Sequence, residues 1–164
     1  MKRLTLLRHA KSSWGQPGLA DHDRPLNQRG QHDAPLMARR LVTHDVRPSL
    51  IVTSSAKRAR QTAKLLAREI GYPIEFMHTE KSLYLADPTT ILEVIETQED
   101  AFSDIIICCH NPGITDLANQ LSGLAIDNVP TCGMVIITTD TDHWSEIASS
   151  ARSFIGFDYP KKTQ

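Results

Sequence analysis

Cysteine is scarce in this 164-residue sequence, which has only three cysteines and no Cys-x-x-Cys pair. An odd number of cysteines without that spacing argues against a disulfide framework and against a zinc site. No arginine stands at the sixth position after any of the three, so the signature of a cysteine phosphatase is missing too. We therefore expect Cys108, Cys109 and Cys132 to be buried, reduced thiols.

An excess of charge and a long apolar run are also absent. The formal net charge is −1, with 18 Lys and Arg against 19 Asp and Glu, and this balance indicates neither a nucleic-acid nor a membrane partner. No run approaches the roughly 20 apolar residues of a membrane span, and Lys2, Arg3 and Arg8 leave no room for a signal-peptide core. We expect a cytoplasmic protein, and the sequence does not indicate an oligomeric state.

Three catalytic signatures are missing as well. The sequence contains no Walker-type glycine-rich loop and no Gly-x-Ser-x-Gly elbow, and its acidic residues are scattered instead of clustering with the histidines. These absences argue against a nucleotide-binding loop, a serine acyl hydrolase and a metallophosphatase. Any phosphoryl transfer would then need a nucleophile from the protein itself.

The features that are present fit one α/β domain spanning residues 1–164. Residues 4–7, 50–52 and 105–109 form apolar runs typical of strands buried on both faces of a sheet. Helical periodicity separates these runs, and strand-helix alternation favours a mostly parallel sheet. We therefore predict a three-layer α/β/α fold.

Helix boundaries follow from capping residues. Asn27 is expected to begin a helix that runs to about residue 43, with Pro35 causing either a kink or a restart at Asp33. Gly71 and Gly123 are placed to end two further helices. The helix between those two is expected to open at residues 87–88, an Asp-Pro pair.

The remaining apolar segments are expected to be strands. Residues 74–77 are predicted as a third strand, and residues 134–139 and 144–148 as an antiparallel hairpin. An edge strand is expected over residues 153–159, followed by a loose tail. The loop over residues 10–26 is longer than most connections, and long ordered loops are often functional.

Basic residues and histidines follow three of the predicted strands. Arg8 and His9 follow the first strand, Arg58 lies in the first turn of the helix after the second, and His110 follows the buried strand 105–109. Parallel strands bring all of these to one edge of the sheet, where open α/β sheets bind their ligands. Two arginines, a helix N-terminus and two histidines describe a pocket for a tetrahedral dianion, above all phosphate.

A nucleophile can be assigned within this group. His9 as a neutral imidazole can attack phosphorus, while Arg8, Arg58 and His110 neutralise charge on the phosphoryl oxygens. The other five histidines are expected to be surface or core residues without a catalytic role, namely His22, His32, His44, His78 and His143.

Three stretches in this order resemble the motifs of the histidine phosphatase superfamily. They are Leu-Leu-Arg-His-Ala-Lys-Ser at 6–12, Ser-Ser-Ala-Lys-Arg-Ala-Arg-Gln-Thr at 54–62, and His-Asn-Pro-Gly at 110–113. The last stretch and the short chain are similar to the compact SixA-type phosphohistidine phosphatases. The resemblance implies a phosphoglycerate mutase-like fold, no metal and no cofactor. It also implies a transiently phosphorylated His9, a phosphate pocket of Arg8, Arg58 and His110, and a phosphohistidine-bearing signalling or phosphotransfer protein as substrate.

Three positions depart from the superfamily pattern. Ala10 replaces the usual glycine, and Gly15 stands where mutase-type members carry an asparagine, which argues against mutase activity. The general acid position falls on Leu85, and the nearest carboxylate, Glu80, is out of register. A missing acid suits a phosphohistidine substrate because imidazole leaves from a labile P–N bond with less help than an alkoxide needs.

Two other functions remain open at this point. A small-molecule phosphomonoesterase on the same scaffold would need a capping segment, for which 164 residues leave little room. A non-catalytic phosphate-binding module would have no use for a nucleophilic histidine. A compact enzyme without a lid should have a shallow, open pocket, which suits a side chain on a folded protein.

Overall fold

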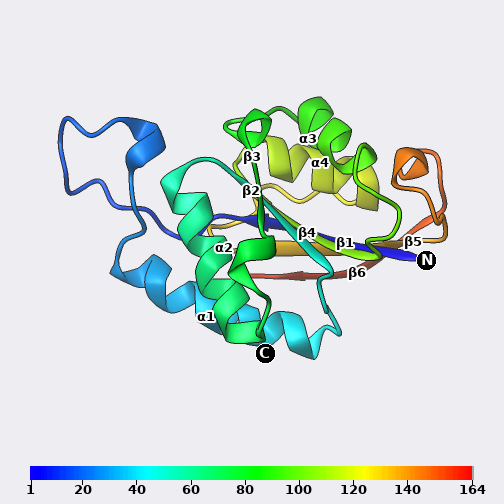
Figure 1. Cartoon of the computed structure of the whole chain (residues 1–164), viewed down its shortest axis with the longest axis horizontal. Coiled ribbons are helices and arrows are strands. Elements are labelled where there is room, and N and C mark those ends of the chain that lie inside the picture. The colour runs from blue at the N-terminus through cyan, green and yellow to red at the C-terminus, as the bar shows by residue number, and fades with distance from the viewer. Residues whose placement is uncertain (164) are drawn as a thin grey trace.

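A six-stranded sheet lies between two layers of helices in the computed structural model, which describes residues 1–163 (Figure 1). The strands run in the order β3-β2-β4-β1-β5-β6, and β3, β2, β4 and β1 are parallel to one another. β5 pairs antiparallel with β1 and with β6. The strands are β1 (Lys2–Arg8), β2 (Leu50–Ser54), β3 (His78–Glu80), β4 (Asp104–Cys109), β5 (Met134–Thr139) and β6 (Arg152–Asp158). The predicted α/β/α architecture with a mostly parallel sheet is confirmed.

Each face of the sheet is covered by a pair of helices. α1 (Gln28–Thr43) and α2 (Lys57–Ile70) pack on one face, and α3 (Pro88–Glu96) and α4 (Gly113–Ser122) pack on the other (Figure 1). The core therefore has two halves, one on each side of the sheet. No helix within residues 1–163 has both the length and the apolar character that crossing a membrane requires.

β4 shows why an uninterrupted apolar run belongs at the centre of such a sheet. Ile105 and Ile107 point into the core under α3 and α4, whereas Ile106 and Cys108 point into the core under α1 and α2. Both faces of the strand are therefore buried, and after Asp104, its first residue, the strand is apolar throughout. The three cysteines are buried free thiols, as expected, and burial raises the pKa of Cys109 to about 12.

The helix ends agree with the capping predictions. The Asn27 side chain accepts a hydrogen bond from Gly30 N at 2.8 Å, and α1 begins after it. Gly71 and Gly123 end α2 and α4 with φ of 79° and 75°, a backbone conformation that favours glycine. α1 continues through Pro35 without interruption, so the alternative of a restart at Asp33 is wrong.

The prediction of a strand over residues 74–77 is wrong. Ile74–Phe76 is a turn of 3₁₀-helix, and β3 begins only at His78. The reason lies in the spacing of the buried side chains. Ile74 and Met77 are three residues apart and pack against the same half of the core, while Phe76 is 66% exposed. Such spacing belongs to a helical turn and not to the alternation of a strand.

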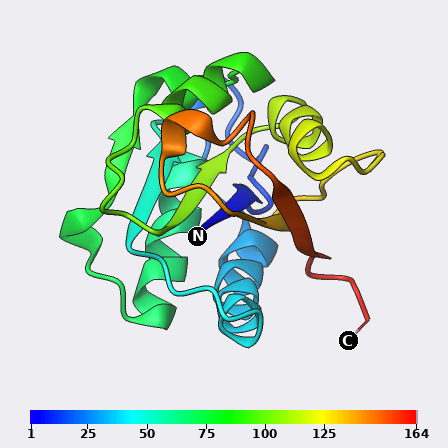
Figure 2. The same cartoon turned by 90° about the vertical axis from the view of Figure 1, so that its right-hand side faces the viewer.

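The prediction that residues 144–148 form the second strand of a hairpin is also wrong. Trp144–Glu146 is a 3₁₀ turn, and β5 pairs instead with β6 at the edge of the sheet (Figure 2). Trp144 and Ile147, again three residues apart, are both fully buried on the α3/α4 side. The edge strand predicted over 153–159 is confirmed as β6. In the predicted tail, residues 161–163 are exposed, and Gln164 lies outside the described residues.

Candidate active site

The carboxyl ends of β1, β2 and β4 lie together because the three strands are parallel. Arg8 ends β1 and is paired in register with Cys109, the last residue of β4, so His9 and His110 follow from adjacent strand ends. Arg58 comes from the first turn of α2, directly after β2. All four predicted site residues line one open cavity of about 240 Å³. The other lining residues are Lys11, Ser12, Trp14, Arg24, Leu85, Asn111 and Thr131.

His9 is held as a neutral imidazole. Its Nδ1 lies 2.8 Å from the backbone oxygen of Ala10, and because a carbonyl can only accept, Nδ1 carries the proton. Burial lowers the pKa of His9 to about 4, with smaller contributions from Arg58 and Arg8, while the bond to Ala10 works in the opposite direction. Nε2 therefore keeps its lone pair at neutral pH, with Arg58 Nε 3.3 Å away.

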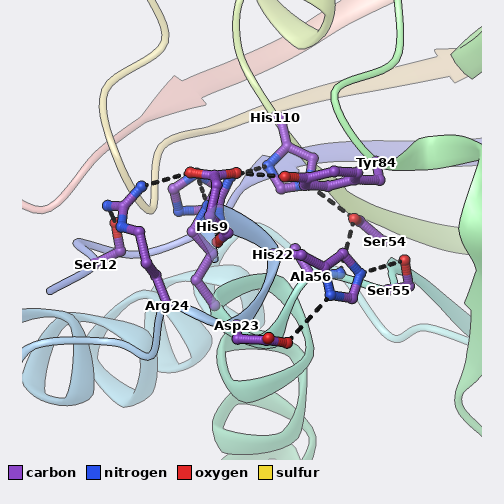
Figure 3. A network of polar contacts seen from close by, with 12 residues as sticks. His9, Ser12, His22, Asp23, Arg24, Ser54, Ser55, Ala56, Tyr84 and His110 are labelled. Carbon is purple, nitrogen blue, oxygen red and sulfur yellow. Dashed lines mark hydrogen bonds and ion pairs between the residues drawn. The ribbon is translucent and has the colours of Figure 1, made fainter. Parts of the chain in front are cut away.

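His110 lies beside His9, with the two ring centroids 5.2 Å apart (Figure 3). Its Nε2 is 2.7 Å from Ser54 Oγ, and its Nδ1 is 3.5 Å from Arg58 Nη2. Burial, with smaller contributions from the neighbouring His9 and Arg58, lowers the pKa of His110 to about 3. Both rings at the strand ends are therefore neutral, and the positive charge of the cavity comes from its arginines and from Lys11.

Arg58 reaches the cavity from the start of α2, where the N-cap residue is Ala56 and has no side chain that could cap the helix. The guanidinium group is oriented by Asp21. Arg58 Nη1 donates to the Asp21 backbone oxygen at 2.8 Å, and Nη2 lies 3.1 Å from the carboxylate. In this orientation Nε faces His9 and Nη2 lies beside His110.

Arg8 is anchored from the opposite side. Its Nη1 donates to the Val129 backbone oxygen at 3.0 Å, and burial together with Arg58 lowers its pKa. Its Nε is buried and has no hydrogen-bond partner among residues 1–163. A buried donor left without a partner costs about 1–3 kcal/mol, so Arg8 is held in this place at a cost in stability.

The loop over residues 10–26 supplies functional residues that the sequence analysis missed. The Asp21 carboxylate accepts a hydrogen bond from Tyr84 Oη at 2.5 Å and binds Arg24 Nη1 at 2.8 Å. These contacts, led by Tyr84, lower the pKa of Asp21 to about 2, so it is an anion and not a proton donor. Loop length was the sequence signal for Asp21, since the loop matches no periodic element.

Arg24 is a third arginine of the cavity. Its guanidinium stacks on Trp14, with Cζ 3.3 Å from the ring centroid. It also donates hydrogen bonds to the Ser12 hydroxyl and to the Ser13 backbone oxygen. Only 9% of the residue is exposed, so its orientation is fixed before any ligand enters.

The position expected for a general acid holds an apolar side chain. Leu85 lines the cavity and is 57% exposed, with φ of 50°. Glu80 points elsewhere, since its carboxylate bonds Ser82 and lies 3.5 Å from His78. Within residues 1–163 the lining of this cavity contains no carboxylate.

The five histidines predicted to lack a catalytic role do not line the cavity. His22 lies nearest: it bonds Ser55 Oγ at 2.9 Å and stacks edge-on with Tyr84. Across the described part of the chain, no three His, Cys, Asp or Glu side chains are grouped as metal ligands.

Comparison with known proteins gives the family of the chain. The family model of the histidine phosphatase superfamily (branch 1) matches residues 4–80. An uncharacterised chloroplastic protein of Arabidopsis thaliana is 33% identical over 88% of this chain and 70% of its own length. An uncharacterised protein of Mycobacterium tuberculosis is 30% identical over 94% of this chain and all of its own length.

A solved structure covers almost the whole chain. The crystal structure assigned to the phosphohistidine phosphatase SixA of Agrobacterium tumefaciens is 27% identical, with a TM-score of 0.82. The alignment covers 97% of this chain and 98% of that one, and it identifies the fold as phosphoglycerate mutase-like. The matches support a phosphatase, and the chain belongs to the histidine phosphatase superfamily.

Proposed function

We propose that this protein is a metal-independent phosphohistidine phosphatase whose substrate is a phosphorylated histidine on another protein, with His9 as the transiently phosphorylated residue. One observation carries the proposal. A neutral His9, with an unprotonated Nε2, opens into a cavity lined by Arg8, Arg58, Arg24 and His110. This is the arrangement that a nucleophilic imidazole needs in order to attack a phosphoryl group.

The first step transfers the phosphoryl group to the enzyme. His9 Nε2 bonds to phosphorus as the P–N bond of the substrate breaks, and the electron pair of that bond stays on the substrate ring. Arg8 and Arg58 stabilise the charge on the phosphoryl oxygens in the transition state. A water molecule then attacks phosphorus, the bond to His9 breaks, and inorganic phosphate leaves.

No carboxylate lines the cavity within residues 1–163, and this favours a phosphohistidine over a phosphate ester. When the distal nitrogen of the substrate ring carries a proton, the departing ring is a neutral imidazole that needs no acid. An alkoxide leaving group must be protonated as it departs. Leu85 lies where that acid would be expected, so the cavity is better suited to the imidazole.

The rim of the cavity also fits a substrate carried on a protein. Trp14 and Leu85, both lining residues, are 76% and 57% exposed. Exposed apolar side chains around a charged centre favour contact with a protein surface. Three free buried thiols fit a reducing compartment, which supports a cytoplasmic location.

Dephosphorylation of a histidine-phosphorylated phosphotransfer domain, followed in time beside a generic aryl phosphate, tests the proposal. We expect fast loss of phosphohistidine, slow aryl phosphate turnover and unchanged rates with a metal chelator. His9→Ala should lose at least a thousandfold in both reactions, whereas His32→Ala, at an exposed histidine outside the cavity, should retain full activity. Acid-free quenching should find label from the phosphorylated domain on His9.

The other outcomes separate the alternatives. Faster aryl phosphate turnover that still depends on His9 would keep the mechanism and reassign the substrate to small phosphomonoesters. Phosphate binding without turnover or label on His9 would indicate a non-catalytic binding module. Loss of activity with the chelator would overturn metal independence.

A further inference from the structure

Ser54, the last residue of β2, is fully buried, and its hydroxyl lies between two groups (Figure 3). Its Oγ is 3.2 Å from Ala56 N and 2.7 Å from His110 Nε2. Neither the motif comparison nor the proposed mechanism gives this hydroxyl a role. Its two contacts bear on where the proton of His110 lies.

A count of hydrogens gives the direction of each bond. The Ala56 amide can only donate, so the serine oxygen accepts from it. The hydroxyl has one hydrogen of its own, and His110 Nε2 is the remaining partner at bonding distance. A serine that donates to Nε2 satisfies both its lone pair and its hydrogen, whereas a serine that accepts from Nε2 leaves a buried O–H without an acceptor.

The other ring nitrogen lies beside Arg58. With Nε2 accepting, the single ring proton of neutral His110 is on Nδ1, 3.5 Å from Arg58 Nη2. Two N–H donors then point into the same space. Such a pair repels when the cavity is empty and is satisfied when one anionic oxygen lies between the two donors.

We propose that Ser54 is a positioning residue that fixes the tautomer of His110, so that Nδ1–H is presented to the phosphoryl oxygen shared with Arg58. The opposite tautomer would present a lone pair to that oxygen and repel it. The inference rests on the proposed function in taking the anion of this cavity to be the transferred phosphoryl group.

A neighbouring serine provides a matched control. Ser55 bonds an imidazole in the same way, with Oγ 2.9 Å from His22 Nε2, but His22 does not line the cavity. Ser54→Ala and Ser55→Ala each remove one hydroxyl-imidazole bond at the start of α2. Only Ser54→Ala should affect the binding of an anion.

The decisive measurement is the ¹⁵N chemical shift pattern of the His110 ring in the wild-type protein without ligand, which reports the tautomer directly. We expect the proton on Nδ1, and a shift toward the Nε2–H form in Ser54→Ala. Inorganic phosphate should bind about tenfold more weakly to Ser54→Ala, and kcat should fall by about 10–100-fold. Ser54→Thr keeps the hydroxyl and should recover most of the phosphate affinity and most of kcat. Ser55→Ala should match the wild type in both.

Two results would overturn the inference: a wild-type His110 with its proton on Nε2, or a folded Ser54→Ala that binds inorganic phosphate as tightly as the wild type. The wild-type spectrum decides the matter even where Ser54→Ala fails to fold. Neither the ¹⁵N spectrum nor the phosphate-binding measurement uses phosphohistidine. If the proposed substrate is wrong, both measurements still test the role of Ser54, so the two failures can be distinguished.

Discussion

Burial keeps the two cavity histidines neutral at pH values where a histidine in water is half protonated. The pKa of His9 is lowered to about 4 and that of His110 to about 3, against 6.5 in an unfolded chain. Between these values the unfolded state binds more protons than the folded state, so protonation favours unfolding. Above pH 6.5 both rings are neutral in the folded and the unfolded state, so they do not lower the free energy of unfolding. As the pH falls below 6.5, the unfolded state takes up protons first and the free energy of unfolding decreases.

Acid should therefore destabilise the protein before it protonates the cavity. We expect the free energy of unfolding to fall between pH 6.5 and 4, by up to about 1.4 kcal/mol per pH unit for each of the two rings. Urea titrations at several pH values measure this slope, and NMR titration of the two rings measures their pKa values. A pKa near 6.5 for either ring would contradict the prediction.

The residues at strand ends were predictable, whereas those in the loop were not. His9, Arg58 and His110 follow directly from strands that the apolar runs locate, and parallel strands must bring their ends together. Asp21 and Arg24 come from a loop whose path no periodicity describes. The place of Asp21 depends on a contact with Tyr84, 63 residues away, which a single sequence does not report.

At the scale of elements, long periodic segments were predicted well and short apolar segments poorly. The helices α1 and α2 have several turns of buried spacing, so their type is unambiguous. Residues 74–77 and 144–148 contain too few positions to separate alternation from a single helical turn. Whether such a segment forms a strand or a helical turn depends on which half of the core its side chains can reach. That is a property of the assembled fold.

The close approach of α4 to the segment before α3 gives a prediction at this scale. A Cβ on Gly113 would lie 2.0 Å from the Ala86 backbone oxygen, so an alanine there forces two backbone segments apart. Ala86 follows Leu85 at the rim of the cavity. We expect Gly113→Ala to lower the free energy of unfolding by more than about 2 kcal/mol and to reduce activity.

Urea denaturation gives this free energy, and Gly15→Ala is the matched substitution. The nearest atom to a Cβ on Gly15 is the hydroxyl of Ser13, a movable side chain, and Gly15 is exposed. If the two variants had equal free energies of unfolding, the backbone around Gly113 and Ala86 would have room for a Cβ and the prediction would be wrong.

At the scale of the whole molecule, burial is graded across the sheet. β1 and β4 lie at its centre and are covered on both faces, while β3 and β6 are edge strands with exposed residues. We expect the amides of β1 and β4 to exchange with solvent only through global unfolding, and those of β3 and β6 through smaller openings. Native-state hydrogen exchange with added denaturant separates the two classes, and equal exchange free energies in β4 and β6 would contradict this.

The position of β1 has a consequence for how the protein is made. β1 precedes the other five strands of the sheet along the chain, yet its two neighbours in the sheet begin at residues 104 and 134. His9 is therefore synthesised long before its surroundings, because β1 must wait for β4 and β5 before it can pair on both sides. A ribosome-bound chain that ends before β5 would hold the proposed nucleophile without one of the two strands that flank β1. The proposed site is therefore completed only after β5 has been synthesised.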